Sequence, residues 1–412
     1  MEPNIDRIKT PGGMITAMLA LQFTAALLLT ILVMFAAPAQ AVQFRNFSTL
    51  VTLAPLPDGF FSVAGVKVKT TGRIVVKAVP GVGKEALHKV DTRVTEVTEL
   101  YLLDSGSYFA ISFADPGDLE QILVRFTASS LVLTAQPDLL QIHDKSGRGA
   151  TRREPTAYIK KLGIEALWEN TKGKGVKVAI IDDGFDLNHE DLRGVASTFG
   201  YDLESGTLDP SPRVALDTHG TEVAGIIFAR HNGIGIDGIA PEADFIAIRH
   251  PDTWTSRTIL SFYLAQMAGA DIINCSWKSR FLLEPIADII NDLTTKGRHG
   301  KGVALVFAAG NEGGGLSDHG SEAALPEVIT VGAVGGNGKP LKFSNFGREV
   351  DVYTFGQDIL TTSNGAEKYS LFSGTSASAA IISGTIALFL SQAPDLNLTD
   401  LHQKIVSFFQ PR

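Results

Sequence analysis

The sequence predicts an α/β fold, a parallel sheet with helices on both faces, preceded by a smaller α+β unit. From about residue 158 onward, apolar runs of strand length alternate with stretches of helical periodicity, which is the pattern of parallel strands joined by helices. Several of these runs end in Asp or Asn, and open α/β sheets carry their sites at the carboxyl ends of strands. With 412 residues and 44% hydrophobic composition, the chain can bury one large core and a smaller one.

Residues 1–41 are predicted to be a targeting segment. A nearly uninterrupted apolar run, 14–37, follows a short polar start that holds Arg7 and Lys9. Ala39-Gln40-Ala41 then matches the small-x-small pattern of a signal-peptidase site. The run is also long enough to span a bilayer, so a retained single membrane anchor stays open beside a cleaved signal peptide. In either case we expect the globular part to be exported, as a secreted, periplasmic or cell-envelope protein.

Residues 42–145 are expected to form the smaller domain. Up to residue 70 the sequence has no clear period and predicts no element. Beyond it, strands and helices are expected in the order βαββαβ, at 74–79, 83–90, 94–103, 108–113, 119–126 and 131–135. This is the order of a ferredoxin-like unit.

Residues 146–157 are expected to be an exposed linker between the two domains. The stretch is charged, contains Gly147 and Gly149, and includes the basic pair Arg152-Arg153. Proteolytic nicking concentrates in linkers of this kind.

Residues 158–412 are expected to form the α/β domain. We expect strands at 176–181, 244–248, 271–275, 303–308 and 327–333, and helices at 221–230, 257–268, 283–296 and 377–391. The last helix is apolar around its whole circumference, which places it in the middle of the core. Ser376 stands at its start, beside the positive end of the helix dipole, where a hydroxyl nucleophile is favourably held. Taken alone, a serine at such a place is more often a helix cap.

Three further polar residues precede Ser376 at the ends of predicted elements. Asp182 ends an apolar strand, His219 begins a helix of small residues, and Asn311 follows another apolar strand. The order Asp, His, Asn, Ser resembles that of the subtilisin-like serine proteases. The motifs that carry the resemblance are Ile181-Asp182-Asp183-Gly184, His219-Gly220-Thr221, Ala309-Gly310-Asn311 and Gly374-Thr375-Ser376-Ala377.

The resemblance implies a serine endopeptidase that acts on protein or peptide substrates. Ser376 would be the nucleophile, His219 the base and Asp182 the group that orients the histidine. Asn311 would donate its side-chain N–H to the oxyanion. The unit 42–145 then resembles the family's propeptide, which assists folding and blocks the site, so we expect a precursor. An accessory domain is the alternative for this unit.

Details of the motifs are similar to the kexin-like branch of the family, with two departures. Asp182-Asp183-Gly184 and Ser276-Trp277 both match that branch. The family usually has proline where this chain has Ala380, and alanine is also a good helix former. Kexin-like enzymes place acids that select arginine where this chain has Lys278 and Arg280. A dibasic specificity is therefore not expected.

Candidate substrate-binding residues are Asp183, Ser276 and Trp277. Ser276-Trp277-Lys278-Ser279 resembles the segment that lines the primary specificity pocket in the family. Asp183 resembles the second acid that faces the substrate in kexin-like relatives, and a solvated or capping carboxylate is its alternative role.

A glycine-rich stretch, 230–238, resembles the family's calcium loop. Its G-x-G-x-x-G pattern follows a predicted helix and leads to Ile239-Ala240-Pro241, so it lacks the strand and helix that a dinucleotide loop needs. The implied Ca²⁺ ligands are the Asp191 carboxylate, the Asn232 side chain and the carbonyls of Arg230, Ile234 and Ile236, and mixed oxygen ligands suit Ca²⁺. A tight loop without metal is the alternative.

Composition and the remaining motifs exclude or weaken other functions. The net charge of −8 argues against a nucleic-acid partner, which favours a basic face. A serine esterase of the α/β-hydrolase type would need G-x-S-x-G and the order Ser, Asp, His, and the chain has neither. A pseudo-protease that binds peptides without cutting them stays open as the alternative, although the complete set of four polar residues argues against it.

Overall fold

The computed structural model describes residues 41–115, 117–141, 157–316, 320–365 and 367–410. The chain divides into two units, Met1–Ala41 and Val42–Arg412, and the described helices and strands belong to the second. The predicted targeting segment up to residue 40, and the predicted linker up to residue 156, lie outside the described residues.

The N-terminal part of this unit contains the six elements that the sequence predicts, in the predicted order. They are β4 Val66–Ala78, α2 Lys84–His88, β5 Val94–Leu103, β6 Gly106–Phe113, α3 Leu119–Thr127 and β7 Val132–Gln141. β4 lies between β7 and β6, and β6 pairs with β5, all antiparallel. β4 begins earlier than expected, and β7 continues to Gln141 beyond its expected end.

Three strands that the sequence did not predict extend this sheet. They are β1 Val42–Asn46, β2 Thr49–Pro55 and β3 Phe61–Val63, in the sheet order β1-β2-β3-β4-β6-β5. Only one residue of β2 is buried, so the strand lacks the alternation of apolar and polar residues that reveals a half-buried strand.

The large domain is built on a seven-stranded parallel sheet. The strands are β8 Lys177–Asp182, β9 Ser197–Asp202, β10 Asp244–Arg249, β11 Ile272–Cys275, β12 Ala304–Ala308, β13 Ile329–Val334 and β14 Val352–Phe355. Their order is β14-β13-β12-β11-β8-β10-β9, and every neighbouring pair is parallel. The five predicted strands are confirmed, and the two that were missed, β9 and β14, are the edges. Edge strands are less buried, so their apolar signal is weaker: β9 has one buried residue.

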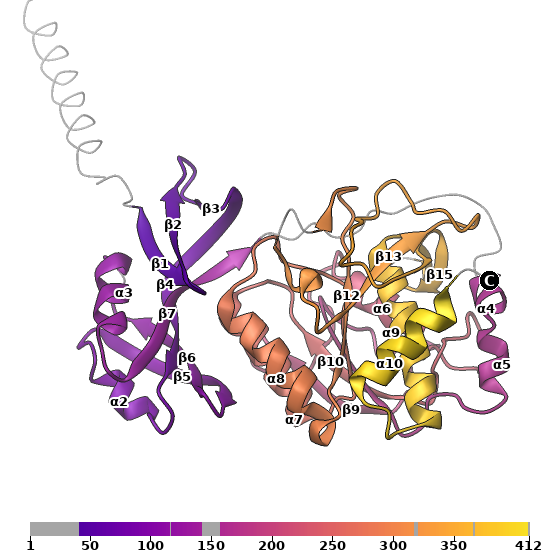
Figure 1. Cartoon of the computed structure of the whole chain (residues 1–412). Coiled ribbons are helices and arrows are strands. Elements are labelled where there is room, and N and C mark those ends of the chain that lie inside the picture. Colours follow the sequence, from indigo (N-terminus) through magenta and orange to yellow (C-terminus); the bar gives the residue numbers. More distant parts are fainter. Residues whose placement is uncertain (1–40, 116, 142–156, 317–319, 366, 411–412) are drawn as a thin grey trace, which may run out of the picture. The chain divides into compact units, whose positions relative to one another are not determined.

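Helices cover both faces of the parallel sheet, as predicted (Figure 1). One face packs against α6 His219–Phe228 and α9 Thr375–Gln392, and the other against α7 Thr255–Met267 and α8 Glu284–Gly300. Alternate residues of β8 separate the two cores, since Val178 and Ile180 face α6 and α9 while Ala179 and Ile181 face the other side.

The remaining elements are α4 Ala157–Leu162, α5 Ile164–Trp168, the 3₁₀ turn η2 Glu322–Ala324, the hairpin β15 Ile359–Thr362 and β16 Tyr369–Phe372, and α10 Leu398–Phe409.

Helix α9 is the centre of the large domain. All of its residues from Thr375 to Leu390 are buried, and the helix continues without interruption through Ala380. Among the described residues it is also the one helix long and apolar enough to cross a membrane, and 89% of that window is buried inside the protein. Its hydrophobicity is therefore explained by its place in the core.

The N-terminal sheet packs against α7 and α8 through tyrosine and acid side chains. Tyr101 Oη donates to Asp292 at 3.1 Å, and Tyr108 Oη donates to Asp288 at 2.7 Å. Lys77 Nζ lies 2.6 Å from the same Asp288 carboxylate. Figure 1 shows the two helices between the N-terminal sheet and the parallel sheet. The N-terminal domain therefore covers a face of α7 and α8.

A glycine inside α6 gives a test of how closely this helix packs on the β15–β16 hairpin. A Cβ on Gly225 would overlap the Oγ1 atoms of Thr361 and Thr362, and both threonines are held by hydrogen bonds to carbonyls of α6. Helix propensity alone predicts that Gly225→Ala stabilises the fold by about 1 kcal/mol. We expect the opposite, a destabilisation of about 1–3 kcal/mol, because overpacking dominates.

Thermal denaturation, with Ser376→Ala in every chain to prevent self-digestion, measures this effect. Asn291→Ala, at an exposed position of α8, is the control and should change stability by less than about 0.5 kcal/mol. A Gly225→Ala chain that melts at the parent temperature or above it would contradict the packing described here.

Candidate active site

An acid and a histidine meet at the carboxyl edge of the parallel sheet. Asp182 is the last residue of β8, and His219 is the first residue of α6. His219 Nδ1 lies 2.8 and 2.9 Å from the two carboxylate oxygens of Asp182. Both side chains are buried. Since Nδ1 is held by the carboxylate, Nε2 is the ring nitrogen that can accept a proton.

Burial and nearby acids act in opposite directions on the pKa of His219. Burial disfavours the charged imidazolium and lowers the pKa, whereas the charge and hydrogen bond of Asp182 raise it. The charges of Asp183 and Glu222 raise it further, and the pKa of His219 is held above its ordinary value. The imidazolium is therefore stabilised by its surroundings.

Ser376 is the second residue of α9 and is buried. Its Oγ donates to the carbonyl of Ser276 at 2.8 Å, and Ser276 Oγ donates to the carbonyl of Ser376 at 3.1 Å. Phe372, at the end of β16, packs edge-on against the His219 ring with 5.2 Å between ring centroids. Phe372, in the strand that precedes α9, therefore contacts the histidine ring. Ser376 is joined by hydrogen bonds to Ser276, in the segment after β11.

Asn311 is oriented by the residue before the serine. The Thr375 N–H and hydroxyl both donate to Asn311 Oδ1, at 2.9 and 3.1 Å. Thr375 Oγ1 also accepts from the N–H of Gly310 at 3.1 Å. Because the amide oxygen is taken up by Thr375, the Nδ2 group of Asn311 is left as the donor that can face a ligand. Sequence reasoning missed this role of Thr375, since nothing in the sequence places residue 375 beside residue 311.

The candidate substrate-binding residues take different places. Asp183 is buried and accepts from the N–H of Gly220 at 2.8 Å, so its carboxylate caps the helix that carries His219. Trp277 Nε1 donates to the carbonyl of Ile181 at 2.7 Å, and its ring packs against Phe307. Trp277 therefore anchors the segment after β11 to the sheet, and Ser276 contacts Ser376.

The predicted calcium loop surrounds a fully buried carboxylate. Asp191 accepts from the Ile236 N–H and the Tyr369 hydroxyl, each at 3.0 Å, and from Asn232 Nδ2 at 3.3 Å. All three donors are neutral, and no Lys or Arg among the described residues forms an ion pair with Asp191. The described His, Cys, Asp and Glu form no metal-binding group of three or more, so a cation here would depend on carbonyl and amide oxygens around one carboxylate. This chemistry suits Ca²⁺.

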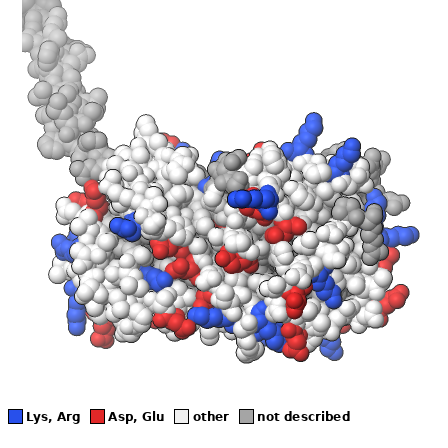
Figure 2. All heavy atoms as spheres, viewed as in Figure 1, with Lys and Arg blue, Asp and Glu red and all other residues white. Residues whose placement is uncertain are grey.

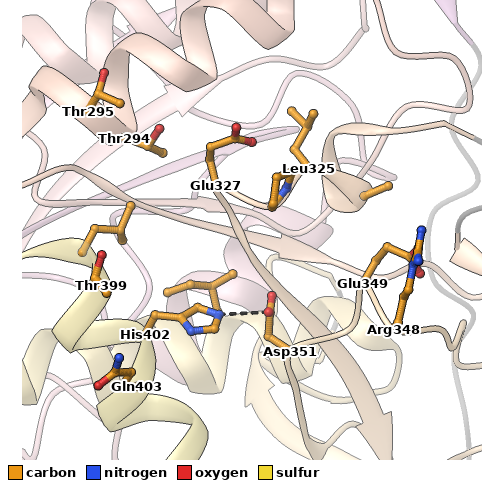
Figure 3. Close-up of a pocket in the computed structure, with 14 residues that line it drawn as sticks. Thr294, Thr295, Leu325, Glu327, Arg348, Glu349, Asp351, Thr399, His402 and Gln403 are labelled. Atoms are coloured by element: carbon orange, nitrogen blue, oxygen red, sulfur yellow. Dashed lines mark hydrogen bonds and ion pairs between the residues drawn. The ribbon is translucent and has the colours of Figure 1, made fainter.

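A pocket of about 750 Å³ lies at the opposite edge of the parallel sheet (Figure 3). It is lined by residues before β13 and β14, at their amino ends, and by α8 and α10. His402 Nε2 lies 2.9 Å from Asp351 in this pocket, and the hydrogen bond to that carboxylate raises the pKa of His402. Because Asp182 and Asn311 lie at the carboxyl ends of strands, this pocket is separate from the candidate site.

The surface charges are mixed on the face shown in Figure 2. Lys and Arg are interspersed there with Asp and Glu, and the described part of this face has no continuous basic surface.

The fold and the site define a class of protein, a serine hydrolase built on a parallel α/β sheet. A buried acid holds a histidine, and a serine begins the central helix next to a fixed amide donor. A model of the subtilase family matches residues 173–408, more than half of the chain. The chain belongs to the subtilase family and is a subtilisin-like serine protease.

Individual relatives agree with this assignment. The thermophilic serine proteinase of Bacillus sp. (strain AK1) is 36% identical over 67% of this chain and 67% of its own. The intracellular serine protease of Paenibacillus polymyxa is 33% identical over 60% of this chain and 78% of its own. The calcium-dependent protease of Nostoc sp. is 30% identical over 59% of this chain and 42% of its own. The crystal structure of a cold-adapted subtilisin-like serine proteinase aligns with a TM-score of 0.50 and 26% identity, over 58% of this chain and 83% of that one.

The raised pKa of His219 gives a prediction for the pH dependence of peptide hydrolysis. A histidine that serves as a base is active only when neutral, so kcat/KM should fall as pH decreases through its pKa. Because that pKa is raised, we expect the midpoint of the acid limb above 6.5, the ordinary value for histidine. Asp183→Asn removes one of the charges that raise the pKa and should move the midpoint to lower pH. A flat profile between about pH 5 and 8 would contradict the expected role of His219 as the base.

Proposed function

We propose that this protein is an exported serine endopeptidase that uses Asp182, His219 and Ser376 as its catalytic triad. The observation that supports this most directly is the position of the buried Asp182 carboxylate, 2.8 Å from Nδ1 of His219. Because Nδ1 is hydrogen-bonded to Asp182, Nε2 is the nitrogen that can accept a proton. A serine nucleophile requires such a proton acceptor. No observation favours the alternative of a peptide-binding pseudo-protease.

In the proposed reaction, Ser376 Oγ attacks the carbonyl carbon of the scissile peptide bond. Its proton passes to Nε2 of His219, and the Asp182 carboxylate stabilises the imidazolium that forms. His219 then returns the proton to the leaving amine, and water repeats the sequence on the acyl-enzyme. Before the attack, the Ser376 hydroxyl donates a hydrogen bond to the Ser276 carbonyl. This hydrogen bond would break when the oxygen attacks the substrate.

The negative charge of the tetrahedral intermediate would be stabilised by two donors. These are Asn311 Nδ2 and the backbone N–H of Ser376, which also lies at the positive end of the α9 dipole. The anchoring of Asn311 Oδ1 by Thr375 supports this role, because a donor that is already oriented needs no reorganisation during the reaction. The acyl side of the substrate cleft would be supported by Ser276 and Trp277. The helix that carries His219 would be supported by Asp183.

We further propose that the protein is made as a precursor, in which residues 42–145 are the propeptide. The contacts of Tyr101, Tyr108 and Lys77 with α8 support a domain that folds against the protease domain. The export proposal rests on the N-terminal sequence. The relatives do not support it uniformly, because one of them is named an intracellular protease. Self-processing is expected between His143 and Pro155, a stretch that contains most of the predicted linker.

Self-processing tests the proposed nucleophile and the proposed precursor together. Ser376→Ala removes the nucleophile and should leave a full-length chain, apart from any signal peptide. Asn311→Ala keeps the nucleophile but lacks one oxyanion donor, so processing should slow by about 10²–10³-fold. Intact mass spectrometry of the parent and both variants, made in a protease-deficient host, measures the cut and the start of the mature chain.

Two outcomes would contradict this scheme in different ways. If the Ser376→Ala chain is still cut at the same bond, another enzyme makes the cut. If the parent cleaves peptides but stays joined to residues 42–145, the N-terminal unit is a permanent accessory domain. Tyr263→Phe, away from the predicted linker and the triad, is the control and should be processed like the parent.

We also propose a structural Ca²⁺ ion at the loop 230–236. A fully buried carboxylate without a cationic partner among the described residues is costly, and a bound cation would offset that cost. The ligands would be Asp191, the Asn232 side chain and the carbonyls of Arg230, Ile234 and Ile236. The ion would stabilise the loop after α6 and has no part in the reaction steps above.

Chelation should therefore lower the melting temperature. An ion that binds only the folded chain adds about 2.7 kcal/mol of stability at 100 times its Kd. We expect EDTA to destabilise the parent and to have no effect on Asp191→Ala, which has already lost the site. Asp237→Asn, at an exposed position of the same loop, should respond to EDTA like the parent. The calcium assignment is wrong if neither EDTA nor Asp191→Ala changes the melting temperature.

A further inference from the structure

A buried lysine lies beside the proposed nucleophile. Lys278 belongs to the segment 276–279 that follows β11, and its side chain is 5% exposed. β11 and β12 are neighbours in the sheet, with Cys275 paired to Phe307, so the segments that follow them leave the same edge side by side. Ser376 contacts the first segment through Ser276. Asn311, in the second segment, is held by Thr375.

The side chain of Lys278 fills the space between these two segments. A Cβ on Gly310 would overlap Cε of Lys278, so the lysine stem lies directly against the backbone of residue 310. The ammonium group reaches Glu312, with 3.2 Å between Nζ and Oε1. Among the described residues, Glu312 is the acceptor of its hydrogen bond.

Glu312 is itself fixed by a buried amide. Asn345 Nδ2 donates to Glu312 Oε2 at 2.5 Å, and Asn345 Oδ1 accepts from the Glu312 N–H at 3.2 Å. Burial raises the pKa of Glu312, but the charge of Lys278 and the Asn345 hydrogen bond outweigh it, and the pKa is lowered. Lys278 is therefore held in place by a partly exposed acid that stays ionised and is itself fixed by the buried Asn345.

The position of this pair determines what it would meet in a substrate. In the proposed reaction, the attacked carbon carries Ser376 Oγ, an oxygen directed to Asn311 and a leaving amine next to His219. Along the sheet edge, β8 carries Asp182 and its histidine, and β11 and β12 lie to one side of it. The remaining substituent, the residue on the acyl side, therefore points away from His219 and towards the space between the two segments.

We propose that Lys278 determines the primary specificity by occupying the pocket for the acyl-side residue, so that the enzyme cleaves after small residues such as Gly, Ala and Ser. A larger side chain must displace the lysine from Glu312, which leaves the buried ammonium group without its partner. A basic side chain also meets the ammonium group directly. This inference rests on the proposed function and defines the substrate class of the same site.

The experiment measures kcat/KM on peptides that differ in one acyl-side residue, Ala, Phe, Glu or Lys, in chains whose Ser376 is also titrated with a phosphonate probe. The parent should prefer Ala. Lys278→Gly opens the space and should raise the ratio of Phe to Ala by about tenfold or more. Lys278→Met keeps the volume without the charge, so it should retain the preference for Ala over Phe while the discrimination against Lys decreases.

The controls separate the possible failures. Lys174→Gly, at an exposed position before β8 and away from this segment, should leave all ratios as in the parent. Lys278→Met serves as the second variant if Lys278→Gly does not fold. A parent that prefers Phe, Glu or Lys, or a Lys278→Gly ratio equal to that of the parent, would overturn the inference and leave the proposed function intact. A folded parent that neither cleaves nor reacts with the probe overturns the proposed function, and the inference with it.

Discussion

The burial of helix α9 under the parallel sheet is the constraint on which the rest of the structure depends. From Thr375 to Leu390 the helix has no exposed face, so its position and rotation are fixed by close packing on all sides. Its first turn lies at the carboxyl edge of the sheet, where Ser376 bonds to Ser276 and Thr375 bonds to Asn311. The same packing that stabilises the core therefore sets the place of the serine and of Asn311, the proposed oxyanion donor.

A second constraint is the concentration of acids around one histidine. Asp182 and Asp183 follow one another at the end of β8, and each contacts the start of α6, at His219 and at Gly220. The first orients the imidazole, and the second holds the helix that carries it. Both favour the charged form of His219, which in the proposed mechanism exists during the attack. The two adjacent acids thus act on the histidine through its side chain and through its backbone.

Much of this arrangement could be predicted from the sequence because the relevant signals are local. Buried strands such as β8 and β12 are continuous apolar runs, and the polar residue that ends each run marks the edge of the sheet. The edge strand β9 and the strand β2 were missed because each has a single buried residue and therefore a weak apolar pattern, whereas β1 alternates like a half-buried strand but is only five residues long. The candidate triad residues could be named from motif order, but their distances could not.

Other features of the site depend on contacts between residues far apart in the sequence. Thr375 orients Asn311 across 64 positions, and Lys278 pairs with Glu312 across 34. The sequence marked Lys278 as a departure from the kexin-like pattern without indicating what its side chain contacts. From the sequence, Asp183 could either face the substrate or cap a helix. Its hydrogen bond from the Gly220 N–H is the contact of a capping residue. Such pairings are set by the fold as a whole.

The most direct test of the account is the covalent labelling of Ser376 by a fluorophosphonate, mapped by mass spectrometry of the digested protein. We expect one adduct, on Ser376, in the parent chain, and its loss in His219→Ala, because the serine is reactive only when a neutral histidine accepts its proton. Trp277→Phe, which keeps an aromatic ring in the anchor of the neighbouring segment, should still be labelled. An adduct on another residue, or a folded parent that stays unlabelled, would contradict the assignment of Ser376 as the nucleophile.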